Sequence, residues 1–139
     1  MNLPQTISDI FGAWKAVPIF RISIPHEPLS VNRIYRRGRG IGLYKTKECK
    51  EYQDYIRHYA KNAIIFKEPL SGPLALHYTF GFTRRGRDAD NPIKPIADCL
   101  QGVVYINDKQ IRRFAVETIV SKDTPFVLIW GGRLEETED

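Results

Sequence analysis

The sequence predicts a single α+β domain, in which two main helices pack on a mixed β-sheet of about five or six strands. The clearest strand signal covers residues 74–83, where large apolar residues alternate with small or polar ones. The clearest helix signal covers residues 47–65, where apolar residues recur every three to four positions. The length of 139 residues favours one domain over residues 1–139.

An extra amphipathic helix is predicted in the N-terminal extension, residues 1–16. Apolar side chains recur there at helical spacing, at Leu3, Ile7, Ile10, Phe11 and Trp14. We expect this helix to cover part of the same core. A dimer contact or a partner-binding segment is the alternative interpretation.

Further strands are predicted over residues 18–24, 41–44 and 126–130, from alternation and apolar composition. Residues 103–106 and 111–120 are also rich in β-branched and aromatic residues. We expect these two strands to form a hairpin or near-hairpin, which returns Asp108 towards Asp88 and Asp90.

A second main helix is predicted after Asn91, with its apolar stripe formed by Ile93, Ile96, Ala97 and Leu100. Asn91 is the expected N-cap, and Pro92 suits the first helical position. Gly102 is the expected stop. Pro95 removes a backbone donor, so we expect either a distorted first turn or a later start.

Composition restricts the possible partners and the compartment. The net charge of +5 favours a polyanion such as DNA or RNA, although ordinary solubility charge gives the same value. Two cysteines provide no disulfide framework, and we expect a cytoplasmic protein. No apolar run approaches the roughly 20 residues that span a bilayer. The acidic residues 134–139 are expected to be a disordered tail.

Carboxylates are concentrated just before the second helix. Asp88 and Asp90 are two residues apart, and in an extended chain such side chains point to the same side. Two such carboxylates repel each other unless a cation lies between them, and Mg²⁺ prefers oxygen ligands of this kind. Taken singly, each aspartate fits a turn or a cap equally well.

Arginines occur in two groups that suit contacts with DNA phosphates. One group lies with an aromatic residue in a glycine-containing loop and comprises Arg33, Tyr35, Arg36, Arg37 and Arg39. The tyrosine is able to stack on an unpaired base. The second group directly precedes the acidic pair and comprises Arg84, Arg85 and Arg87. A solvated hairpin tip is the alternative for the first group.

Residues 87–110 resemble the signature of the RusA family of Holliday-junction resolvases. The matching motifs are Arg-Asp-Ala-Asp-Asn-x-x-Lys at 87–94 and Gly-Val-Val-Tyr-x-Asn-Asp-x-Gln at 102–110. A weaker similarity extends over residues 18–131 and includes the early Pro-x-Ser-x-Asn segment at 28–32. By position, the resemblance implies metal ligands at Asp88, Asp90 and Asp108 and a catalytic lysine at Lys94.

Three further residues are expected to support the site: Asn91, Asp98 and Gln110. The family often has Asp-Asp where this chain has Asn107-Asp108, and Asn107 brings no charge. The second position carries the family's essential acid, and it is retained. Asp98 lies four residues after Lys94 and is placed to pair with it on a helix and so to orient it. An ordinary ion pair on the helix surface is the alternative.

The resemblance implies a metal-dependent endodeoxyribonuclease that resolves four-way DNA junctions by paired symmetric nicks in recombination and repair. The expected cofactor is Mg²⁺, which Mn²⁺ is able to replace, and no small-molecule cofactor or membrane is expected. The expected assembly is a homodimer, because a C2 dimer presents two equivalent sites to a nearly two-fold junction. A different metal-dependent nuclease acting on flap or branched DNA and a non-catalytic junction-binding protein are the alternatives.

Overall fold

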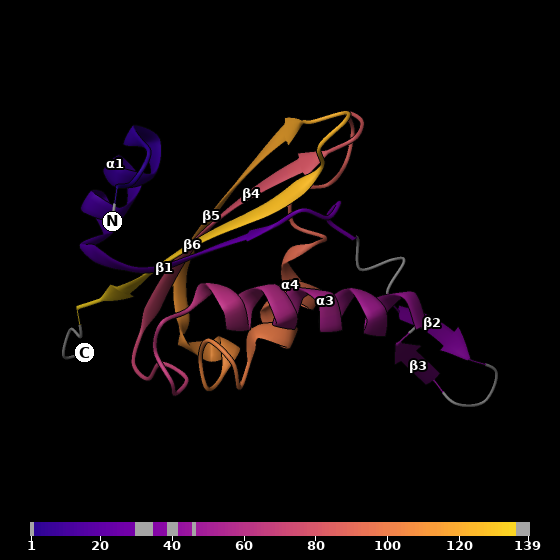
Figure 1. The fold of residues 1–139 in the computed structure, drawn as a ribbon, viewed down its shortest axis with the longest axis horizontal. Helices are drawn as coiled ribbons and strands as arrows, with labels where there is room; N and C mark the ends of the chain where they lie inside the picture. Colours follow the sequence, from indigo (N-terminus) through magenta and orange to yellow (C-terminus); the bar gives the residue numbers. More distant parts are fainter. Residues whose placement is uncertain (1, 30–34, 39–41, 46, 136–139) are drawn as a thin grey trace.

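The computed structural model describes residues 2–29, 35–38, 42–45 and 47–135, and it gives the backbone alone for residues 35–38 and 42–45. Its centre is a four-stranded sheet in the order β1-β6-β4-β5 (Figure 1). The four strands are β1 (Ala16–Ile24), β4 (Leu74–Phe82), β5 (Ile111–Val120) and β6 (Phe126–Leu134). β1 and β4 pair antiparallel with β6, and β5 pairs parallel with β4.

The prediction of one α+β domain with a mixed sheet is therefore confirmed, but the number of strands in that sheet was wrong. β2 (Tyr35–Gly38) and β3 (Gly42–Lys45) pair only with each other in the described residues and form a separate two-stranded ribbon. This ribbon projects from the body beyond the N-terminal end of the long helix (Figure 1). Short, polar, glycine-containing strands have little apolar surface to bury against a sheet.

Helices cover both faces of the main sheet. α3 (Lys47–Ala63) and α4 (Ile93–Leu100) pack on one face, where inward residues of β4 such as Leu76 and Phe80 join the main core. α1 (Gln5–Trp14) packs on the other face, where Phe11 meets Ala75 and Trp130. β4 is consequently buried on both sides. The N-terminal helix was expected to cover part of the same core, but it packs on a second, smaller cluster on the opposite face of the sheet.

The predicted strand at residues 103–106 and the predicted hairpin were both wrong. Gly102 has a φ of +83° and starts a turn in which the Val104 N–H donates to the Leu100 carbonyl at 2.9 Å. Tyr105 makes only isolated bridges, to Leu70 and Gln101. β5 instead pairs parallel with β4 through a crossover that contains α4. Parallel pairing requires such a long connection, which local sequence patterns do not reveal.

The start of α4 also differs from the prediction. The helix begins at Ile93 and Pro92 is its N-cap, so Asn91 is not the cap and Pro92 lies one position before the first helical residue. Pro95 falls in the first turn, where backbone N–H groups have no partner within the helix. The missing donor therefore costs little. Of the two predicted alternatives, the later start is the one found, since the helix begins at Ile93 rather than at Pro92. Gly102 follows the helix end with positive φ, as a stop glycine does.

The last strand is longer than predicted. β6 continues to Leu134, whose N–H donates to the Pro73 carbonyl at 3.0 Å, so the predicted disordered tail does not begin at 134. Residues 136–139 lie outside the described residues. Within the described part of the chain, no helix is long and apolar enough to cross a membrane.

Candidate active site

An open pocket of about 320 Å³ brings together three of the predicted site residues. Asp90, Lys94 and Asp108 line it, although 18 positions separate the two aspartates in sequence. The remaining lining residues are aromatic or apolar: Tyr78, Ile93, Ala97, Ile111 and Phe114. Two carboxylates and one ammonium thus share a pocket whose walls are otherwise mainly apolar.

Asp90 is positioned by the turn that leads into α4. Its carbonyl accepts a hydrogen bond from the Ile93 N–H at 3.1 Å, which fixes the backbone just before the helix. Its side chain is exposed. The preceding residues form an irregular loop, so the alternation expected of a strand does not orient Asp88 and Asp90 here. An exposed carboxylate is accessible to a cation.

Lys94 lies on the first turn of α4 and is 66% exposed. Its Nζ is 3.6 Å from the Asp98 carboxylate, one helical turn later, so the predicted pairing with Asp98 is confirmed. α4 is itself fixed to α3 by buried contacts, since the Gln53 amide donates to the Pro95 carbonyl at 3.1 Å. Exposed ion pairs of this spacing contribute little to stability, so the ammonium group is free to exchange partners.

Asp108 begins a short 3₁₀ turn, Asp108–Gln110, at the end of the α4–β5 connection. Its N–H donates to the Gln101 side-chain oxygen at 3.0 Å, which links the turn to the end of α4. Asn107 is the N-cap of this turn, and its side chain accepts from the Lys109 N–H at 2.9 Å. Asn and Asp are about equally good N-caps, so the capping function does not need the family's usual Asp.

Gln110 supports the turn rather than the pocket directly. Its side-chain oxygen accepts from the N–H groups of Ile106 and Asn107 at 2.9 and 2.8 Å. Its amide nitrogen donates to the carbonyls of Leu70 and Gly72, both at 2.9 Å. Four hydrogen bonds from one side chain thus tie the Asp108 turn to the loop before β4.

Asp88 does not line the pocket. Its carboxylate accepts a hydrogen bond from the Asn91 side-chain amide at 2.9 Å, and both residues lie in the loop before α4. Among the residues that the structure describes, no three His, Cys, Asp or Glu side chains form a ready-made metal-binding cluster. Asp90 and Asp108 nevertheless fit Mg²⁺, which usually binds through one or two carboxylates and substrate phosphates while keeping several waters.

The basic groups lie in two places. Arg84, Arg85 and Arg87 are exposed in the loop between β4 and α4, a few residues before Asp90. Arg36 and Arg37, with Tyr35, belong to β2, and only their backbone is described. Arg33 and Arg39 lie outside the described residues.

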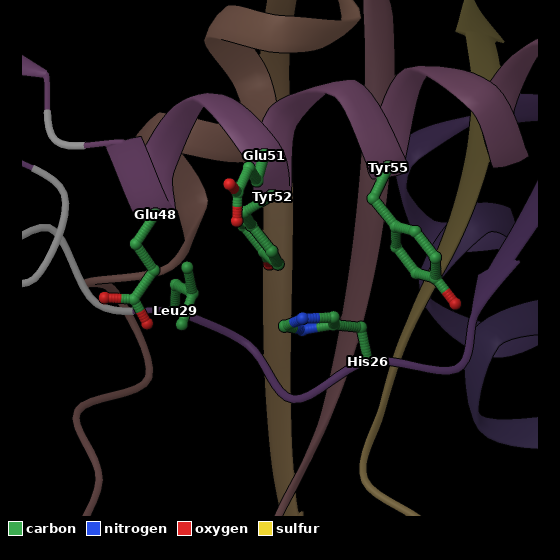
Figure 2. Close-up of a pocket in the computed structure, with 6 residues that line it drawn as sticks. All are labelled: His26, Leu29, Glu48, Glu51, Tyr52 and Tyr55. Carbon is green, nitrogen blue, oxygen red and sulfur yellow. The ribbon is translucent and has the colours of Figure 1, made fainter.

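A second pocket, of about 230 Å³, lies between α3 and the segment after β1 (Figure 2). The His26 ring faces two tyrosines of α3, with centroids 5.0 Å from Tyr52 and 5.5 Å from Tyr55. Glu48 and Glu51 line the same pocket, and the described lining residues include no lysine or arginine. None of the residues that match the family's catalytic groups lines it, so this pocket is a weaker candidate for a nuclease centre.

Sequence reasoning missed two residues of the first pocket and its surroundings. Gln101 holds the Asp108 backbone, but on a predicted helix it looked like an ordinary polar residue. Tyr78 lines the pocket, but in the predicted strand it looked like one more inward-facing apolar residue. One signal was available in the sequence. Along the row of large alternating residues at positions 74–82, Tyr78 is the only one with a hydroxyl group, and the others are leucine or phenylalanine.

Paired carboxylates and a lysine beside exposed arginines are the groups found in phosphodiester-cleaving nucleases. Comparison with protein families gives the particular family. Residues 25–129 match the family described as endodeoxyribonuclease RusA, which is 105 of the 139 residues. The chain belongs to the RusA endodeoxyribonuclease family. At the family level, membership implies metal-dependent cleavage of Holliday junctions. No curated protein gives a significant match.

Proposed function

We propose that this protein is a Mg²⁺-dependent, structure-selective endodeoxyribonuclease that resolves four-way DNA junctions by paired symmetric nicks. The observation that carries the proposal is the shared pocket of Asp90, Lys94 and Asp108. These are three of the four residues whose positions match the family's catalytic groups, and separate parts of the β4–α4–β5 connection supply them. Asp88 is the fourth, in the same loop as Asp90.

In this proposal, Asp90 and Asp108 hold the divalent cation. Asp88, which lies in the same loop as Asp90, contributes a further carboxylate. When bound, the cation polarises the scissile phosphate and lowers the pKa of a bound water. Lys94 stabilises the negative charge that grows on the phosphate in the transition state. Asp98 holds the Lys94 ammonium near the pocket until substrate arrives.

The substrate is tested by cleavage of matched four-way, flap and linear duplex DNA with and without Mg²⁺. We expect paired nicks on the four-way junction in Mg²⁺ and none in its absence. Preferential cleavage of the flap instead supports the alternative nuclease. Junction binding without nicking in any divalent cation identifies a non-catalytic binding protein and contradicts the proposal.

We expect the arginines to make binding strongly dependent on salt. Replacing Arg84 and Arg85 with Ala, or Arg36 and Arg37 with Ala, should reduce the slope of log K against log salt by about 0.9 for each lost phosphate contact. The measurement is junction binding over a salt series without divalent cation. Arg133→Ala is the control, because Arg133 pairs with Leu74 at the opposite end of β4 from Arg84. An unchanged slope in both double variants places the DNA elsewhere.

We infer further that the functional unit is a homodimer formed along β5. This ten-residue strand is an outer strand of the main sheet and exposes Phe114, Ile119 and Val120. An antiparallel pairing of two copies centred on Ala115 sets Arg113 opposite Glu117 of the second copy, which gives opposite charges across the axis. Edge strands of this length pair readily with another strand.

Ile119→Lys should therefore produce monomers, since it introduces a charge into the proposed apolar contact, and Ile119 does not line the pocket. Sedimentation equilibrium of the wild type and the variant measures this. Lys122→Glu in the following loop is the control for a change of charge outside the proposed contact, and it should leave the dimer intact. A variant that remains dimeric, or a wild type that is monomeric at micromolar concentration, contradicts the β5 interface.

A further inference from the structure

The hydroxyl of Tyr78 is a buried polar group without a partner. Tyr78 lies in the middle of β4 and is fully buried, and its hydroxyl makes no hydrogen bond. Most buried tyrosine hydroxyls do have a partner, because desolvating an unpaired one is costly. A group that weakens the folded protein in this way calls for a functional explanation.

The surroundings of Tyr78 connect it to the candidate active site. Its side chain lines the same pocket as Asp90, Lys94 and Asp108. Burial raises the pKa of Tyr78, and the nearby Cys99 and Asp108 raise it further. Burial likewise raises the pKa of the Cys99 thiol to about 12, so this thiol is neutral at pH 7. The phenol stays protonated and is a donor rather than a base.

Tyr105 shows how a structural tyrosine behaves in the same core. Its side chain is also buried, and its hydroxyl donates to the Ala97 carbonyl at 2.6 Å. Burial raises the pKa of Tyr105 as well, so both phenols are protonated. The two residues differ in one respect: Tyr105 has a partner within the fold, and Tyr78 does not. Other unpartnered groups, such as the Trp130 indole nitrogen, belong to residues that do not line this pocket.

We propose that Tyr78 is a positioning residue of the nuclease site: its hydroxyl donates a hydrogen bond to the Asp108 carboxylate, directly or through one water, when the pocket holds a divalent cation. The inference rests on the proposed function and adds a residue to that site. Gln101 fixes the Asp108 backbone, and Tyr78 would fix the carboxylate itself. Outer partners of this kind orient a metal ligand and are important for affinity.

Tyr78→Phe tests the proposal because it removes only the hydroxyl. We expect the apparent affinity for Mn²⁺, measured without DNA by electron paramagnetic resonance of the free ion, to fall about 10- to 100-fold. The Mg²⁺ concentration for half-maximal junction cleavage should rise in parallel. The midpoint of urea unfolding in metal-free buffer should stay the same or increase, since an unsatisfied buried group has been removed.

Tyr105→Phe is the matched control. It leaves the Ala97 carbonyl without its donor, so the urea midpoint should fall while the Mn²⁺ affinity of the folded protein stays at the wild-type value. Wild-type Mn²⁺ affinity in Tyr78→Phe overturns the proposal. So does a fall in its urea midpoint as large as that of Tyr105→Phe, because the hydroxyl then has a structural partner.

The same experiment separates failure of this inference from failure of the proposed function. If the wild-type protein binds Mn²⁺ and cleaves junctions but Tyr78→Phe behaves identically, only the role of Tyr78 is wrong. If the wild-type protein neither binds the ion nor cleaves junction DNA, the nuclease assignment of the pocket is wrong, and the role of Tyr78 fails with it.

Discussion

Asp90→Asn is expected to abolish nicking while junction binding stays intact or becomes slightly tighter. The change removes one of the two carboxylates that share the pocket and with it the charge needed to hold a divalent cation. It also removes negative charge that repels DNA phosphates. The cleavage rate should fall by more than the roughly 100-fold that follows the loss of an outer metal-site partner. Rates and binding are measured on the same four-way junction.

Asp123→Asn is the control for this variant. It makes the same chemical change at an exposed aspartate in the β5–β6 connection, outside the pocket, and should leave both rate and binding at wild-type values. Circular dichroism of Asp90→Asn verifies that it is folded. Equal losses of binding and cleavage in a folded Asp90→Asn protein count against a metal-binding role.

Lys94→Ala is expected to lower the single-turnover cleavage rate about 10²- to 10³-fold at saturating protein, by analogy with the loss of one oxyanion-hole donor. Only interactions that are stronger in the transition state accelerate chemistry, so binding should change much less than rate. Lys94→Arg should not restore full activity, because a planar guanidinium does not replace a compact ammonium group. Folding should be unaffected, since Lys94 is largely exposed and its pair with Asp98 is at the surface of α4.

Lys47→Ala is the matched control, because Lys47 also forms an exposed pair with an acid four residues later, Glu51, at 3.9 Å. At saturating protein its cleavage rate should equal the wild-type rate even if DNA binding is weaker. A wild-type rate for Lys94→Ala under the same conditions identifies Lys94 as a phosphate-holding residue and excludes its catalytic role.

Periodicity predicted most of the elements, and the failures have a common physical origin. Strong alternation over residues 74–83 and helical spacing over 47–65 match β4 and α3 closely. β4 is buried on both faces, but its large apolar side chains all lie on the face of the main core, and α3 buries one apolar stripe. The run at 103–106 has the composition of a strand, yet Val104 and Tyr105 are buried in a turn after α4. Burial alone favours the same residue types in both settings.

Strand pairing was beyond the reach of local patterns. The parallel pairing of β5 with β4 depends on α4 crossing between them, and nothing in residues 103–120 alone distinguishes it from a hairpin. The motif resemblance named three residues of the pocket from the sequence: Asp90, Lys94 and Asp108. Their common pocket, the presence of Tyr78 in it and the Gln101 hydrogen bond to the Asp108 N–H depend on contacts between distant segments.

The position of a bound metal ion tests the central claim most directly. Crystals of protein shown to nick junctions in Mn²⁺ should be soaked in that ion, and anomalous difference density should be collected at the manganese edge. We expect a peak within ligand distance of the Asp90 and Asp108 carboxylates, and no such peak in Asp90→Asn crystals soaked in the same way. A manganese peak elsewhere in the active protein, with none between Asp90 and Asp108, would contradict the account.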